Sequence, residues 1–315
     1  MSQKMIIRLF IACFVLMSFS AGCTEQMSLS FDQGGVSTYK FVSETTQDFK
    51  FEQLSAGKKK VEQNKTLIKT VFDQQIIAVN EDASADAKVT LKEIKILVKN
   101  PEGVVLDFDS TRPSDRTQDL RKLVGQSYTI QITPDGKAKP INVKQARNAL
   151  TAGPDRNWGK NFLSDKEIVR RHEVVSMPSI DESQIKKGGN WTTEGKSHPR
   201  MLEQKTFEKV YTVDNISDKS GRKVATISME ASPSGALEGV APGTDFSFMA
   251  KMFDTKENYN GQVKFDIESG RVISMNEKMA ATYTASEMPK GKPDAKGPDT
   301  LIMGLTYQIS LEQIK

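Results

Sequence analysis

The last part of the chain alternates between apolar and polar or small side chains without a break. Met303, Leu305, Tyr307, Ile309 and Leu311 occupy one phase, and the residues between them occupy the other. Successive side chains of a β-strand point to opposite faces, so this pattern predicts a strand with one buried face. Similar alternation occurs in residues 39–51, 66–79, 89–108, 128–132, 211–213, 225–229, 263–267 and 279–283. The sequence therefore predicts a mainly β (α+β) fold with a curved antiparallel sheet or half-barrel.

The alternation changes phase once inside a single predicted strand. Val89 and Leu91 hold one phase, whereas Ile94 and Ile96 hold the other. One extra residue in a strand produces this shift, so we expect a β-bulge there, which also bends the sheet.

The middle of the chain has helical signals instead. Asn142 precedes apolar residues at helical spacing, and Ser164 to Glu167 form a capping box before Ile168 and His172. We predict that residues 142–175 are a helical connection between two β-rich halves, residues 37–141 and 176–315. A hairpin in each half, near Gly136 and near Gly270, raises the alternative that the halves are related by duplication.

The first residues have the order of a secretory signal. Lys4 and Arg8 precede an apolar run of 11 residues from 9 to 19, and small residues lead to Cys23. This run is well short of the roughly 20 residues that cross a bilayer as a helix. The sequence from Ser20 to Cys23 resembles a bacterial lipobox, which implies acylation of Cys23. The alternative is ordinary cleavage near Ala21, which would leave a secreted protein with a free thiol.

The segments that follow from this interpretation are a signal peptide over residues 1–22 and a flexible tether over residues 23–36. Cys13 leaves with the signal, so the mature chain has one cysteine and forms no internal disulfide. Removing Lys4 and Arg8 leaves 42 basic and 40 acidic residues, a balance of +2. This near-neutral charge argues against nucleic acid as a partner.

Several stretches together resemble a family of uncharacterised bacterial lipoproteins that is known only as a domain of unknown function. They are Cys23, residues 123–136 with their Thr-Pro-Asp-Gly turn, Met177-Pro178, residues 188–191 and the hairpin over residues 261–270. The resemblance implies the fold of that family and a location outside the cytosol. By its strand pattern alone, the body is also similar to the half-barrels of periplasmic lipoprotein carriers. The family resemblance implies no catalytic residue and no cofactor. In enterobacterial lipoproteins, an aspartate directly after the acylated cysteine retains the protein in the inner membrane. Here that position is Thr24, which indicates the outer membrane where the host has two membranes.

Three aromatic residues are candidates for ligand binding. Trp191 follows two glycines and could stack on a sugar or lipid, and Phe246 and Phe248 begin a stretch rich in rings and thioethers that suits an apolar pocket. A place in the core is the alternative for all three.

Motifs that suggest catalysis are weak. The sequence Asp107-Phe-Asp109-Ser-Thr looks like the nucleophile loop of haloacid-dehalogenase-type phosphatases, but the parallel α/β pattern of that fold is missing, which favours a solvated strand end. His172 and His198 do not have the spacing of zinc ligands, so no metal site is predicted. His172 is expected in the core.

These observations predict a lipid-anchored, extracytoplasmic binding or scaffold protein of the bacterial envelope. We expect it to hold a hydrophobic ligand or an envelope partner, without catalysis or cofactor. The alternative is a hydrolase of envelope components that uses a carboxylate pair no motif reveals.

Overall fold

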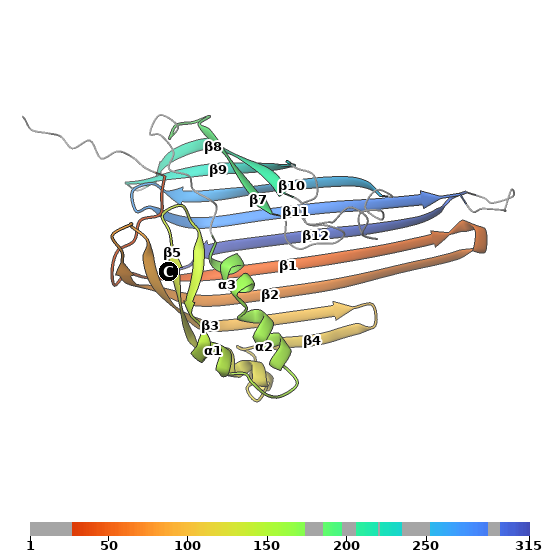
Figure 1. The fold of residues 1–315 in the computed structure, drawn as a ribbon, viewed down its shortest axis with the longest axis horizontal. Coiled ribbons are helices and arrows are strands. Elements are labelled where there is room, and N and C mark those ends of the chain that lie inside the picture. The colour runs from red at the N-terminus through yellow and green to blue at the C-terminus, as the bar shows by residue number, and fades with distance from the viewer. Residues whose placement is uncertain (1–26, 174–184, 197–205, 220, 235–252, 289–296) are drawn as a thin grey trace, which may run out of the picture.

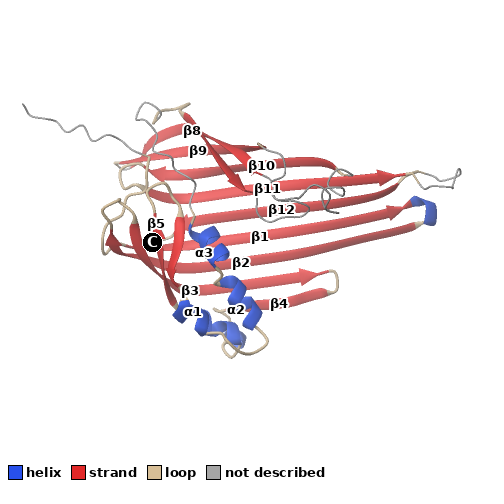
Figure 2. Cartoon of the chain, viewed as in Figure 1, coloured by secondary structure: helices blue, strands red, loops and turns tan. Residues whose placement is uncertain are grey.

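The computed structural model describes residues 27–173, 185–196, 206–219, 221–234, 253–288 and 297–315. These residues form one large antiparallel sheet with three α-helices on one face (Figures 1 and 2). The strands are β1 (Val36–Gln53), β2 (Lys58–Val79), β3 (Ala85–Asn100), β4 (Gly103–Asp109), β5 (Ser127–Ile132), β6 (Ala138–Asn142), β7 (Asn190–Lys196), β8 (Thr206–Lys219), β9 (Arg222–Pro233), β10 (Asp254–Asp266), β11 (Arg271–Glu287) and β12 (Asp299–Gln313). The predicted mainly β fold with a curved antiparallel sheet is confirmed.

The strand order is β6-β5-β3-β2-β1-β12-β11-β10-β9-β8-β7, and β4 pairs with β3 beside this path. Most neighbours in the order are also neighbours along the chain. The exception at the centre is the pairing of β1 with β12, in which Phe41 lies opposite Leu311 and Phe49 opposite Met303. This long-range pairing joins the strands before and after the helices into one continuous sheet.

The helices are α1 (Lys144–Asn148), α2 (Arg156–Phe162) and α3 (Asp165–His172), all within the segment predicted to be helical. Ser164 caps α3 as predicted, because its hydroxyl accepts the backbone N–H of Glu167 at 3.3 Å. After β4 the chain forms two 3₁₀ helices, η2 (Pro113–Asp115) and η3 (Asp119–Leu123). No described helix is long and apolar enough to cross a membrane.

The predicted bulge lies in β3. Val71 of β2 pairs with Glu93, and the next residue, Phe72, pairs with Leu91, so Lys92 is the extra residue. The bulge keeps Leu91 and the following apolar residues of β3 on the same buried face despite their change of phase.

The helix-bearing face of the sheet, called the inner face here, carries the core. Its buried residues come from every long strand, for example Phe41, Phe72, Ile227, Phe265 and Leu305. The other face carries cross-strand ion pairs such as Lys65–Glu44 and Lys40–Glu312. One packed face and one solvated face account for the period of two in the sequence.

The segment before β1 belongs to this core. The tether predicted over residues 23–36 enters the described part of the chain at Met27, which is fully buried, and Leu29 is buried as well. The N–H of Leu29 donates to Pro134 O at 2.8 Å, and that of Ser30 donates to Gly270 O at 2.9 Å. This segment is therefore fixed between the tips of the β5–β6 and β10–β11 hairpins.

Candidate functional site: a chamber between the sheet and two helices

A cavity of about 360 Å³ lies between the inner face of the sheet and helices α2 and α3. Strands β1, β2 and β3 form its floor, and the two helices form its wall. The lining residues are Ser43, Thr45, Thr66, Ile68, Ile96, Trp158, Asn161, Phe162, Ser164, Lys166, Glu167 and Arg170. Small-molecule pockets measure about 300–1,000 Å³, so this chamber has room for a small ligand.

The floor carries a group of hydroxyls. Thr45 of β1 lies opposite Thr66 of β2, and Ser43 lies opposite Ile68 in the same register. Among the described residues, none forms a hydrogen bond with the hydroxyls of Ser43, Thr45 or Thr66. A buried or half-buried hydroxyl without a protein partner is satisfied by water or by a ligand. The floor can therefore donate to and accept from a molecule in the chamber.

The wall opposite the floor carries two aromatic side chains. Trp158 and Phe162 lie four residues apart on α2, so their side chains share one helix face. Gly159 lies between them, and a Cβ there would come within 2.6 Å of Leu150. The glycine lets α2 approach the preceding segment closely, which places the two rings over the sheet.

Charged side chains lie at the end of the chamber formed by α3. Arg170 forms an ion pair with Glu167, and its Nη1 donates to the Tyr307 hydroxyl of β12 at 3.4 Å. Lys166 is exposed and forms no ion pair within the described part of the chain. The chamber thus combines apolar walls, neutral hydroxyls and two cationic groups with one anionic group.

A buried network fixes α3 to the sheet. Arg171 Nη1 donates to the Tyr128 hydroxyl at 2.9 Å, and Tyr128 in turn lies 2.8 Å from His172 Nε2. Arg171 occupies one lone pair of the Tyr128 hydroxyl, and when neutral His172 carries its proton on Nδ1 this hydroxyl can donate to Nε2. Burial, followed by the charge of Arg171, holds the pKa of His172 well below its usual value. His172 is a core residue, as predicted.

A second, smaller cavity of about 60 Å³ lies at the end of the sheet where β1 begins. Leu29, Phe31, Tyr39, Phe72 and Arg271 are among its lining residues. This volume holds only a few water molecules, so it does not compete with the chamber as a ligand site.

Trp191, which is the one predicted ligand-binding residue within the described part of the chain, does not line the chamber. Trp191 is 7% exposed, and its ring stacks on Tyr211 with centroids 5.2 Å apart and an interplanar angle of 13°. It is a core residue of the β7–β8 pair and lines neither cavity. Phe246 and Phe248 lie outside the described residues, as does Cys23.

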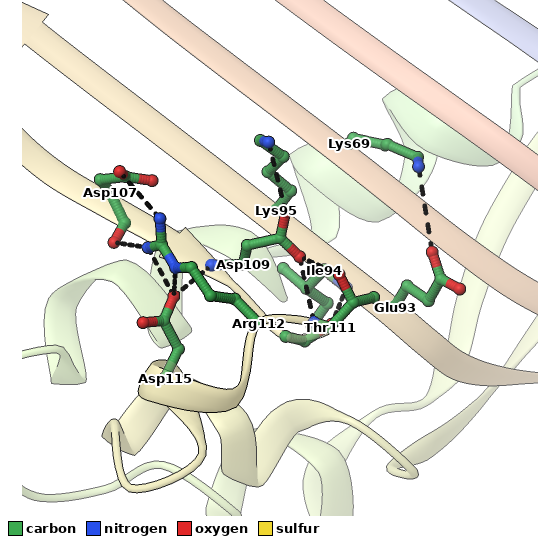
Figure 3. Close-up of polar contacts among 10 residues, drawn as sticks. Lys69, Glu93, Ile94, Lys95, Asp107, Asp109, Thr111, Arg112 and Asp115 are labelled. Carbon is green, nitrogen blue, oxygen red and sulfur yellow. Dashed lines mark hydrogen bonds and ion pairs between the residues drawn. The ribbon is translucent and has the colours of Figure 1, made fainter.

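The Asp107–Thr111 motif lies at the end of β4, an antiparallel strand, where cations and hydroxyls surround its carboxylates (Figure 3). Asp109 accepts the Thr111 hydroxyl at 2.7 Å and pairs with Lys95 at 3.2 Å. The Thr111 hydroxyl is the main cause that lowers the pKa of Asp109. Arg112 bridges Asp107 and Asp115, and it lowers the pKa of Asp115 to about 2. This arrangement stabilises a strand end, as the sequence favours.

The hydrolase alternative needs two carboxylates that face each other across a cleft. The buried carboxylates of the described residues are Asp115, Asp266 and Glu277. Asp266 accepts the N–H groups of the β10–β11 turn, and Glu277 pairs with Lys209 at 3.2 Å. Each is bound by donors. Glu277 also has a carboxylate in its vicinity, because burial and, to a smaller extent, the charge of Glu277 raise the pKa of Glu173. The described residues also contain no group of three or more potential metal ligands.

The sequence did not identify the residues that line the chamber, because each of them fits an ordinary strand or helix position and none belongs to a binding motif. The available signal was the polar Ser43, Thr45 and Gln47 at positions that the phase of Phe41 and Phe49 assigns to the buried face. A polar run on the buried phase of a long strand indicates a place where the core is not solid.

Comparisons with known proteins give limited similarity. No family model matches the chain, and no curated protein does. Lipovitellin, in a structure of its lipid–protein interactions, has a TM-score of 0.48 and 9% identity, with 90% of this chain and 25% of that chain covered. This chain therefore spans about a quarter of the lipovitellin chain.

Two other solved structures cover most of the chain at low similarity. DynF from the dynemicin biosynthesis pathway of Micromonospora chersina has a TM-score of 0.17 and 8% identity over 92% of this chain and 86% of that chain. A DUF1329 family protein from Desulfovibrio piger has a TM-score of 0.12 and 9% identity over 87% and 85%. The function proposed for this protein rests on the chamber and not on these similarities.

Proposed function

We propose that this protein is an extracytoplasmic binding protein, anchored through a lipid on Cys23, whose chamber holds an amphiphilic small molecule. The role is binding, without a chemical step. The observation that carries the proposal is the chamber of about 360 Å³, with aromatic rings on one side and unpaired hydroxyls on the other. Rings bury the apolar part of a ligand, and the hydroxyls and cations match its polar part.

The anchor is supported by the sequence before Met27. A short apolar run after Lys4 and Arg8 ends in small residues before Cys23, which suits lipoprotein processing. Several acyl chains hold a protein to a leaflet far more firmly than one, because each buried methylene contributes about 0.8 kcal/mol. Since Thr24 follows the cysteine, the outer membrane is the proposed site in a host with two membranes.

Native mass spectrometry of the protein, released from detergent micelles in the gas phase, tests the binding role. The wild type is expected to carry one bound small molecule that organic extraction releases. Thr45→Phe places a ring inside the chamber and is expected to abolish this bound mass and to weaken binding of a dansyl-labelled fatty acid at least tenfold.

Thr46→Phe is the matched control. Thr46 is the next residue of β1 and its side chain points to the opposite face, so this variant adds the same ring outside the chamber. It should bind as the wild type does. Equal binding by both variants, or a wild type that neither carries a molecule nor binds the probe, would exclude the chamber as the site.

The anchor needs a separate measurement. Labelled palmitate should enter the wild type, and Cys23→Ser should remove the label and move the protein to the soluble fraction. A Cys23→Ser protein that stays with the membrane would contradict the anchor without affecting the result for the chamber.

A further inference from the structure

The start of the described chain is held to one end of the sheet. We call this end the strand-start end, since β1 begins there, and it includes the turns at Pro134 and Gly270. Besides the bonds of Leu29 and Ser30, the N–H of Gly34 donates to Ile76 O at 2.8 Å, and Asp32 pairs with Arg271 at 2.7 Å. A segment with this many contacts does not act as a flexible tether.

Gly270 shows how closely the segment packs. Its φ of +60° suits glycine, and a Cβ there would lie 2.5 Å from the Ser30 Cβ and 2.7 Å from the Ser30 nitrogen. The β10–β11 turn and the segment before β1 are therefore in direct backbone contact.

Only three residues separate Cys23 from the buried Met27. Four steps along a fully extended chain span at most about 14 Å. If Cys23 carries the lipid, as the proposed function requires, the strand-start end cannot lie farther than this from the leaflet. The body is then attached closely, and its orientation is restricted.

The same end exposes apolar side chains. Val36 is 57% exposed, Val79 is 42% exposed and Ile314 is 50% exposed. These residues come from the start of β1, the end of β2 and the C-terminal segment, which all lie at this end of the sheet. Val36 pairs with Gln75 of β2, and the N–H of Ile314 donates to Thr38 O at 2.9 Å. Exposed apolar groups beside a lipid attachment point suit the boundary between headgroups and acyl chains.

We propose that the strand-start end rests on the lipid leaflet, with Val36, Val79 and Ile314 in contact with it, and that the β1–β2 hairpin points away. In Figure 1 the tip of this hairpin lies at the opposite end of the sheet from the start of β1. Strand β2 has 22 residues, so at about 3.3 Å per residue its two ends are roughly 70 Å apart. This orientation rests on the proposed function, because it requires the lipid on Cys23.

Labels at the two ends of β2 test the orientation. The mature chain has no cysteine besides Cys23, so Val79→Cys and Val61→Cys each introduce one free thiol in the lipidated protein. Val61 is exposed near the far end of the same strand, which makes it the matched control. Each variant is labelled with a fluorophore and reconstituted into phosphatidylcholine–phosphatidylglycerol vesicles that contain brominated acyl chains.

Bromine quenching acts over short distances, so quenching at position 79 is expected to exceed that at position 61 at least fivefold. Equal quenching at both positions would show a body that lies along the leaflet, and quenching at neither would show an end held away from it. Either result would overturn the proposed orientation.

Two further measurements separate this inference from the anchor itself. Flotation with the vesicles reports the anchor, so a protein that does not float contradicts lipidation rather than orientation. A spacer of roughly twelve Gly and Ser residues after Glu25 should keep flotation and reduce quenching at position 79 by at least half. Unchanged quenching with the spacer would overturn the argument from the short connection.

Discussion

The inner face of the sheet is built in two ways on the two sides of the β1–β12 pair. On β12, Leu305, Tyr307 and Ile309 are buried and apolar, whereas the residues beside them on β1 include Ser43 and Thr45. Helices α2 and α3 lie over β1 to β3 and leave the chamber between them and the hydroxyls. The same alternation of side chains thus produces a packed core on one side and a chamber on the other.

Polar groups on the inner face also differ between the two sides. On the β11 side, Glu277 is buried, pairs with Lys209 at 3.2 Å and accepts the Tyr259 hydroxyl at 2.5 Å. Burial, followed by the charge of Glu277, raises the pKa of Tyr259, which keeps the phenol a donor. On the β1 side the hydroxyls have no such partners among the described residues. Glu277 and Tyr259 of the packed side are thus satisfied within the fold. The hydroxyls of the chamber are left for water or a ligand.

The largest expected effect comes from breaking the buried pair. Lys209→Met leaves the Glu277 carboxylate without its cation in a desolvated site, so we expect a loss of about 3–5 kcal/mol in the free energy of unfolding. Urea denaturation measures this loss. The matched control is Lys40→Met, which breaks the exposed pair with Glu312 and should cost less than about 1 kcal/mol. Equal losses of unfolding free energy in the two variants would mean that the β11 side is not a desolvated core.

Truncating a side chain should also lower the free energy of unfolding by different amounts on the two sides. Leu305→Ala leaves a void in the packed side, and we expect a loss of about 2–5 kcal/mol in unfolding free energy. Thr45→Ala removes atoms that already border the chamber, so its cost should stay below about 1 kcal/mol. Urea denaturation of both variants checks the comparison, and similar losses would show that the chamber side is packed like its neighbour.

A smaller effect is expected from pH. The pKa of His172 is lowered in the folded protein, so the unfolded chain binds more protons below its ordinary pKa of about 6.5. Stability from neutral His172 is therefore complete above pH 6.5 and falls as the pH decreases, by up to about 1.4 kcal/mol per unit. Denaturation at pH 7.5 and 5.5 measures the slope.

His172→Gln is the control for this slope. The amide oxygen can accept the Tyr128 hydroxyl but does not titrate, so the part of the slope that His172 contributes should disappear. An unchanged slope in this variant would assign the pH dependence to other groups. It would also contradict the role given to neutral His172 in fixing α3 to the sheet.

Local features of the fold could be predicted because nearby residues determine them. The bulge at Lys92 follows from the phase change between Leu91 and Ile94, and the cap at Ser164 follows from its spacing to Glu167. The 3₁₀ helix η3 depends on more than its nearby residues, since tertiary contacts bury its Leu120.

Non-local features were not predictable in the same way. Met27 and Leu29 lie in a stretch of the sequence that is polar and has no apolar period. They are core residues only because the tips of the β5–β6 and β10–β11 hairpins meet around them. The hydroxyls of Thr45 and Thr66 become one floor because β1 and β2 pair in a register that places them side by side. The aromatic wall above them depends on how α2 packs, which the spacing of Trp158 and Phe162 does not determine.

The sequence by itself determined which residues of the strands share the core-facing side, because the period of two follows directly from strand geometry. It also determined the turns, the bulge and the cap, which depend on backbone chemistry within a few residues. Only the tertiary structure decided that β1 pairs with β12, that the start of the chain is fixed to the sheet and that a chamber remains under α2 and α3. These features arise from contacts between residues far apart in the chain, whose formation depends on the packing of the whole sheet rather than on any local pattern.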